Sequence, residues 1–177
     1  LIRAGLTSGA AIERLFIDRA LRTLHFHGRR AAAWDGLTKA YPTPPPGTTL
    51  LANRPGNAGR RAAESSGAPW VLADADILTL SHPGRTNSPL EPAHTLFNNL
   101  THALRGERLK GVEAVAWSST VTTPDILFYH LLPRLLVIAE AAWHGEDSLP
   151  WDKLAPLVEQ EMAHLRRSVP YWNPQRP

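Results

Sequence analysis

The sequence predicts an α/β fold built around a mainly parallel sheet, with a helical C-terminal third. Short apolar runs alternate with segments of helical periodicity, and this alternation is typical of βαβ units. Hydrophobic residues make up 43% of the 177 positions, which is enough for one substantial core. We therefore expect a single domain over residues 1–177, divided into an N-terminal helix (8–23), an α/β core (24–123) and C-terminal helices (124–167).

The first elements are expected to be a helix, a short strand and a second helix. Ser8 is a suitable N-cap for the first helix, in which apolar residues recur at helical spacing. Alternating residues before Gly28 predict a strand at 24–27, and the alanine-rich stretch 30–41 predicts the second helix. Prolines make residues 42–47 an extended connector.

The remaining elements are predicted from apolar runs separated by glycine, proline and hydroxyl-rich loops. Pro124 suits the first turn of a long apolar helix, which Pro133 should kink. The expected elements, in chain order, are a strand at 48–52, a loop at 53–59, a helix at 60–66, a strand at 70–74, a helix at 92–104, a strand at 112–117, a loop at 118–123, and helices at 125–143 and 151–167.

Two carboxylates stand near the end of the most apolar strand candidate. Residues 70–73 form a short apolar run with a proline before it, which favours an inner strand. Strand side chains alternate faces, so Asp74 and Asp76 are expected to point the same way. Neighbouring carboxylates repel unless a cation, a positive side chain or a shared proton separates them. We therefore expect Asp74, Asp76 and His82 to bind a divalent cation; the alternative is a solvated strand end.

The loop that follows the strand at 48–52 is a candidate phosphate site. Glycines let backbone amides approach a bound group, and a helix N-terminus favours anions. The loop lacks the Gly-Lys-Ser/Thr of a Walker loop and the G-x-G-x-x-G fingerprint, so a plain glycine turn is the alternative. The ligand-binding residues expected here are Asn53, Arg54, Gly56, Asn57, Gly59 and Arg60.

Three of these features are expected to meet at one edge of the sheet. Open α/β sheets bind ligands at the carboxyl ends of their strands. That edge would gather the glycine loop, the pair Asp74 and Asp76, and the hydroxyl-rich loop that begins with Ser118 and Ser119. An anionic phosphate would lie toward the arginines, and hydroxyls or a chelated cation toward the carboxylates.

Composition limits the classes of site and partner. The chain has no cysteine, which excludes disulfides, thiolate metal sites and cysteine nucleophiles. Residues 1–61 carry ten Lys and Arg against three Asp and Glu. This basic third is a candidate surface for nucleic acid or phosphates; the alternatives are that it binds the acidic remainder of the chain or is a solvated face.

Hydropathy bears on location and on assembly. No apolar run approaches the roughly 20 residues that span a bilayer, and no signal-peptide pattern is present. The expectation is a cytoplasmic protein with no membrane partner. The helix at 125–143 is apolar on many sides, which also predicts a homodimer through part of it.

Two local resemblances bear on function. Leu24–Gly28, with the strand, glycine turn and alanine-rich helix of Thr48–Glu64, resembles the Rossmann-like nucleotide-binding superfamily called SLOG. Ser118-Ser119-Thr120 stands where that family has a later glycine-rich turn. This resemblance implies a Rossmann-like three-layer domain that binds a nucleotide. Asn53–Leu78, which ends in an Asp-x-Asp pair, looks like the middle of a family-2-type glycosyltransferase.

The favoured hypothesis is a domain that binds a nucleotide or related phosphate-containing ligand, with hydrolase or transferase activity. Asp74 and Asp76 would be its catalytic residues, holding ribose, a divalent cation or a water nucleophile. One alternative is a metal-dependent Asp-x-Asp transferase or nuclease. Another is a non-catalytic module that binds protein or nucleic acid. A thermal-shift screen of nucleotides and divalent ions would separate the three.

Overall fold

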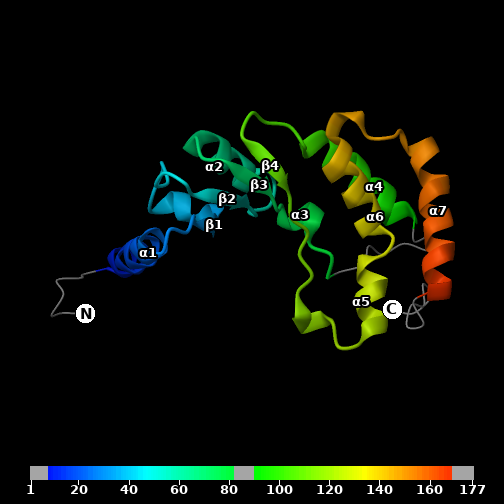
Figure 1. Ribbon diagram of the computed structural model, residues 1–177, viewed down its shortest axis with the longest axis horizontal. Coiled ribbons are helices and arrows are strands. Elements are labelled where there is room, and N and C mark those ends of the chain that lie inside the picture. The colour runs from blue at the N-terminus through cyan, green and yellow to red at the C-terminus, as the bar shows by residue number, and fades with distance from the viewer. Residues whose placement is uncertain (1–7, 82–89, 169–177) are drawn as a thin grey trace.

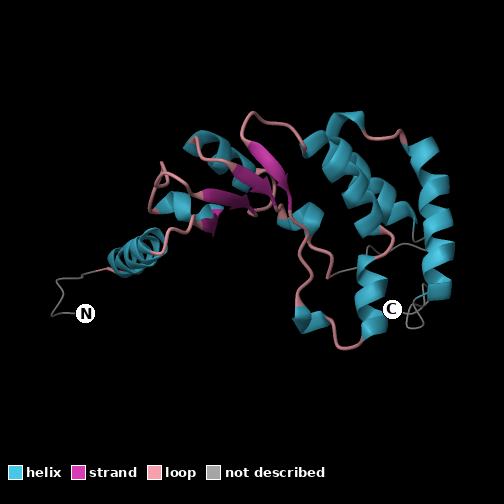
Figure 2. Cartoon of the chain, in the orientation of Figure 1, coloured by secondary structure: helices cyan, strands magenta, loops and turns pink. Residues whose placement is uncertain are grey.

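The computed structural model of the chain describes residues 8–81 and 90–168. Its centre is a four-stranded sheet, shown in magenta in Figure 2, in which all strands are parallel. The strands are β1 (Ala32–Trp34), β2 (Thr49–Ala52), β3 (Trp70–Leu72) and β4 (Leu109–Val112). The prediction of an α/β fold with a parallel sheet and a helical C-terminal third is confirmed.

The order of the strands departs from the predicted arrangement. The strands follow one another in sequence order, β1-β2-β3-β4. A doubly wound sheet of the Rossmann type reverses its order at a switch point, and the described strands contain no such reversal. The Rossmann-like three-layer arrangement is therefore not confirmed.

Helices occupy the connections and both ends of the molecule. Figure 1 shows α1 (Gly9–Phe26) at one end and α7 (Trp151–Ser168) at the other, with the sheet and α2 (Ala58–Ser66) between them. The other α-helices are α3 (Ala75–Leu78), α4 (Leu90–Ala103), α5 (Pro124–Leu131) and α6 (Arg134–His144), and the 3-10 helices are η2 (Asp35–Lys39), η3 (Ser118–Thr120) and η4 (Gly145–Asp147).

The core runs from the inner strands into the helical part. Leu50 of β2 and Trp70 and Leu72 of β3 are each at most 1% exposed, and α2 packs on these two strands. The same cluster continues through Leu100 of α4 and Val137 of α6. Burial of large apolar side chains at about 25 cal/mol per Å² is what holds short strands such as these in place.

The region before β2 differs from the prediction. α1 continues through Phe26, so the strand expected at 24–27 does not form. The helix expected at 30–41 is wrong as well, because this stretch forms β1 and η2. β1 pairs in parallel with Thr49–Leu51, and this tertiary pairing outweighs the helix propensity of its alanines.

The long apolar helix expected at 125–143 forms two helices, α5 and α6, that are separated at Pro133. Proline lacks the N–H that would continue the helical hydrogen bonds, which explains the break. Thr123 caps α5 by accepting a hydrogen bond from the backbone N–H of Ile126 at 3.4 Å. Within the described ranges, no helix by itself has the length and apolar character of a membrane span; only α5 together with Arg134–Asp147, bent by 46°, does.

Candidate functional site

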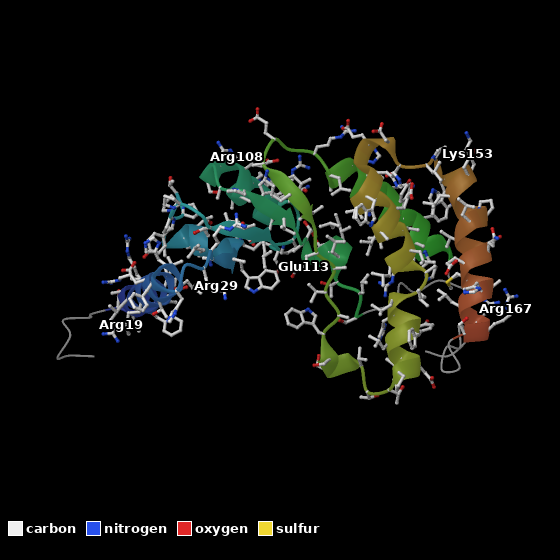
Figure 3. The ribbon with its side chains drawn as sticks, in the orientation of Figure 1. Arg19, Arg29, Arg108, Glu113, Lys153 and Arg167 are labelled. Carbon is white, nitrogen blue, oxygen red and sulfur yellow. The ribbon has the colours of Figure 1, made fainter. Side chains whose placement is uncertain are left out.

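The carboxyl ends of the four strands bring together the polar and aromatic side chains that could bind a ligand. Trp34 ends β1 and Asp35 follows it, Asn53 and Arg54 follow β2, and Asp74 follows β3 after one residue. The segment after β4 begins with Glu113, which Figure 3 labels between the sheet and the helical part of the molecule. We call these ends the carboxyl edge.

A buried carboxylate links β1 to β2 at this edge. Asp35 is 1% exposed and accepts hydrogen bonds from the backbone N–H groups of Asn53, at 2.8 Å, and Arg54, at 3.3 Å. It also pairs with the guanidinium Nε of Arg54, whose side chain is 39% exposed. A buried charge is costly unless it is paired and hydrogen-bonded, and Asp35 has both kinds of partner. The pair thereby holds Arg54 across the ends of two strands.

The side chain of Asn53 links β2 to β3. Its side-chain amide donates to the backbone carbonyl of Ala73 at 2.9 Å, and the backbone carbonyl of Asn53 accepts from the backbone N–H of Ala75 at 2.9 Å. Both contacts keep the strand ends in register. Asn53 was predicted to bind a ligand, and the structure gives its side chain a structural hydrogen bond.

The two predicted catalytic aspartates do not share a strand face. β3 ends at Leu72, and the 3%-exposed Asp74 is the N-cap of α3, accepting from the N–H of Asp76 at 2.9 Å. Asp76 lies in the first turn of α3 and accepts from the N–H of Gly56 at 3.0 Å. Asp76 therefore faces the glycine loop, whereas Asp74 caps the N-terminus of α3. Their catalytic role stays a prediction.

The metal prediction finds no ligand cluster in the structure. Across residues 8–81 and 90–168, no three or more His, Asp or Glu side chains are grouped to hold a metal ion. His82, the third predicted ligand, lies outside the described residues. The divalent cation remains an untested prediction.

The backbone amides of the glycine loop already donate within the protein. The N–H of Gly56 donates to Asp76, that of Ala58 to Pro55 and that of Gly59 to Arg54. A phosphate cradle needs amides directed at the ligand. Gly56 and Asn57, both with a φ of 62°, form a left-handed turn that leads the chain into α2. The alternative of a plain glycine turn fits this loop.

Two other residues of the predicted phosphate site have structural positions. A Cβ on Gly59 would lie 2.7 Å from the backbone N of Arg54, so this glycine lets α2 begin close against the end of β2. Arg60 pairs with Glu64 at 2.9 Å and donates to the carbonyl of Arg105 at 3.0 Å and that of Ala103 at 3.4 Å. It therefore binds the C-terminal end of α4.

Ser118 and Ser119 lie in η3 and are both exposed. They come after Trp117, beyond the last paired residue of the β4 segment, Val115. The structure bonds Asn53 and Arg54 to Asp35, and Gly56 to Asp76, whereas no hydrogen bond among the described residues ties the serines to any of these residues.

Sequence reasoning missed two exposed tryptophans. Trp34 at the end of β1 is 42% exposed, and Trp117, after β4, is 52% exposed. The backbone N–H of Trp117 donates to the buried hydroxyl of Ser81 at 2.5 Å. A signal for these two residues was present in the sequence, since each tryptophan comes at or near the end of a parallel strand. It was not specific, because six tryptophans occur in the chain and the exposure of a side chain cannot be read from the residue type.

Comparison with known proteins gives a consistent result. A family model described as "Glycosyl hydrolase family 20, catalytic domain" matches residues 1–146. The beta-N-acetylhexosaminidase of Cellulomonas fimi is 36% identical over 67 residues. A solved structure of the GH20 exo beta-N-acetylglucosaminidase from Vibrio harveyi, in complex with N-acetylglucosamine, matches 98% of the chain with a TM-score of 0.78 and 17% identity.

A second solved structure, of a beta-N-acetylhexosaminidase, matches 99% of the chain with a TM-score of 0.71 and 19% identity. The chain spans only part of each of these proteins. It covers 12% of the Cellulomonas fimi protein, 29% of the Vibrio harveyi chain and 39% of the second solved chain.

These matches overturn the nucleotide hypothesis. The resemblances to SLOG and to family-2-type glycosyltransferases are wrong, because the family model and the solved neighbours are glycosidases. Nucleotides, other phosphate ligands and nucleic acid are therefore wrong as partners, and nucleotide transfer is wrong as an activity. Of the predicted reaction classes, hydrolysis agrees with the matched family.

Proposed function

The chain belongs to glycosyl hydrolase family 20, catalytic domain, and from this premise we propose that its carboxyl edge holds the sugar in a glycosidase that removes N-acetylhexosamine residues. The matched relatives named as N-acetylhexosaminidases or N-acetylglucosaminidases support this substrate class. Because the chain spans a minor part of those relatives, the activity is proposed for the catalytic domain to which this sheet contributes.

The strand order supports placing this sheet in a (β/α) barrel. Strands that follow in sequence order through right-handed crossovers keep their helices on one side of the sheet. Such a sheet closes on itself, with its helices outside and its ligand site at the carboxyl ends of the strands. The carboxyl edge is then the part of the chain that would face a substrate.

The observation that carries the proposal is the position of Trp34 and Trp117. Trp34 ends β1, and Trp117 comes two residues after Val115, the last paired residue beyond β4; these are the two outer strands, and both tryptophans are about half exposed. A pyranose ring presents apolar C–H faces that pack on a flat aromatic surface, while its hydroxyls need polar partners. Arg54, whose side chain is 39% exposed and is held by Asp35, the residue after Trp34, supplies a polar donor.

Three carboxylates of this edge, those of Asp35, Asp74 and Asp76, are better suited to hold the structure than to transfer a proton. Most glycosidases use two carboxylates, but family 20 is among the exceptions in which the substrate assists its own cleavage. Asp35 is engaged by Arg54, Asp74 by the first turn of α3 and Asp76 by Gly56. We therefore assign substrate holding to this edge, with Arg54 as its polar donor.

Fluorine NMR on the fluorotryptophan-labelled chain tests this assignment. Titration with N-acetylglucosamine should shift the resonances of Trp34 and Trp117, which single Trp→Phe variants identify. Trp143 is the matched control, because it is 86% exposed but lies on α6, away from the carboxyl edge. A titration that shifts Trp143 as much as Trp34 and Trp117, or shifts none of them, would contradict the proposal.

A further inference from the structure

We propose that Ser81 is a positioning residue that fixes Trp117 as a sugar-stacking surface. This inference rests on the proposed function, since it concerns how one of the two exposed tryptophans is held. Its basis is the hydrogen bond in which the backbone N–H of Trp117 donates to Ser81 Oγ at 2.5 Å. The two residues are 36 positions apart in the chain, so this contact joins separate segments.

Ser81 belongs to a segment that extends the sheet beyond its regular strands. After β3 the chain forms α3, and the residues that follow then run beside the segment after β4. Thr79 and Val115 form a parallel bridge, Leu80 N–H donates to Val115 at 2.8 Å, and Val115 N–H donates to Leu78 at 2.9 Å. The next N–H of this series, at Trp117, is received by the side chain of Ser81 instead of a backbone carbonyl.

Ser81 and Trp117 differ in burial, so their hydrogen bond joins a buried side chain to the backbone of an exposed residue. Ser81 is 1% exposed, whereas Trp117 is 52% exposed. A short buried side chain therefore fixes the backbone from which an open indole projects. Holding a binding residue in place before the ligand arrives lowers the entropy lost on binding, because fewer rotations remain to be stopped.

A buried arginine braces the same segment from the helical part. Arg134 of α6 is 9% exposed, and its guanidinium donates to the carbonyl of Leu80 at 2.7 Å as well as to the carbonyl of His130. Burial lowers the pKa of Arg134 below its usual value. Burying this group is costly unless it is hydrogen-bonded, and one of its bonds goes to the residue directly before Ser81.

The test compares sugar binding by the full chain and by variants of Ser81. In Ser81→Ala, which removes the acceptor, the apparent Kd for N-acetylglucosamine at the Trp117 resonance should rise about three- to tenfold, because the segment that carries Trp117 must then be ordered when the sugar binds. Ser81→Thr keeps the hydroxyl and should bind within about twofold of the unmodified chain. Addition of N-acetylglucosamine should not shift the Trp143 resonance in either variant.

Each outcome separates this inference from the proposed function. If the unmodified chain shows no response to the sugar, the proposed function fails and the inference with it. If the unmodified chain responds and Ser81→Ala responds equally, only the inference is overturned, and Ser81 has a purely structural role. Should Ser81→Ala not fold, Ser81→Cys keeps the size and weakens the acceptor; full sugar affinity in Ser81→Cys would then overturn the inference.

Discussion

Asp35 and Arg54 form an ion pair across the carboxyl ends of β1 and β2, and Asp35 also accepts the backbone N–H of Arg54 itself, at 3.3 Å. The carboxylate is 1% exposed and the guanidinium side chain 39% exposed. Asp35 thus accepts hydrogen bonds from both the backbone and the side chain of Arg54. This arrangement fixes the start of the glycine loop and the direction of the arginine.

Removing Arg54 should therefore lower the free energy of unfolding more than breaking an ion pair on the surface. Arg54→Met leaves Asp35 buried with backbone donors only, and we expect a loss of about 2 kcal/mol in the free energy of unfolding. The matched control is Glu146→Gln, which breaks the exposed pair of Arg105 and Glu146 and should change stability by at most about 0.5 kcal/mol. Urea denaturation measures both, and equal effects would refute the structural role of the Asp35–Arg54 pair.

Gly59 should tolerate no side chain. An added Cβ would lie 2.7 Å from the backbone N of Arg54 and 2.9 Å from that of Asn53, and these backbone atoms are held by Asp35. We expect Gly59→Ala to destabilise the chain by about 1–3 kcal/mol. Gly36→Ala is the control, because nothing lies within 4 Å of its added Cβ. Thermal melts in which the two variants behave alike would contradict this packing.

Trp70 should be among the most sensitive core positions. It is 1% exposed in β3, between β2 and β4, and a Cβ added at Gly106 would lie 3.0 Å from its ring. Trp70→Ala should lower the free energy of unfolding by about 3–5 kcal/mol. Trp143→Ala removes the same side chain from an 86% exposed position, so a change of about 0.5 kcal/mol is expected. A loss under about 1 kcal/mol in Trp70→Ala would exclude the buried position.

The sequence predicted those elements whose local pattern and burial agree. β2 and β3 lie within the strands expected at 48–52 and 70–74, and α7 lies within one residue of the helix expected at 151–167. Their residues have the apolar periodicity of the structure that they form. β1 could not be found in this way, because its alanines favour a helix and only pairing with β2 makes them a strand.

The site was also predicted only in part, because its contacts depend on how distant segments pack. Parallel strands do place Asn53, Arg54 and Asp76 at one edge, as expected from their positions after strands. Their predicted roles in binding and catalysis stay predictions, and several of these side chains also have structural contacts, because short polar side chains at strand ends cap helices and close turns, as Asp74 does. The exposure of Trp34 and Trp117 depends on packing between distant segments, which periodicity along the chain does not encode.

The central claim is that Trp34 and Trp117 make the carboxyl edge a binding surface for N-acetylhexosamine. Calorimetric titration of the chain with N-acetylglucosamine tests it most directly, with the double variant Trp34→Ala/Trp117→Ala beside Trp143→Ala. Both variants lose exposed indole surface, but only the first loses it at the carboxyl edge. We predict that the double variant binds at least about tenfold more weakly, whereas Trp143→Ala binds as the unmodified chain does. Undiminished affinity in the double variant would contradict the claim.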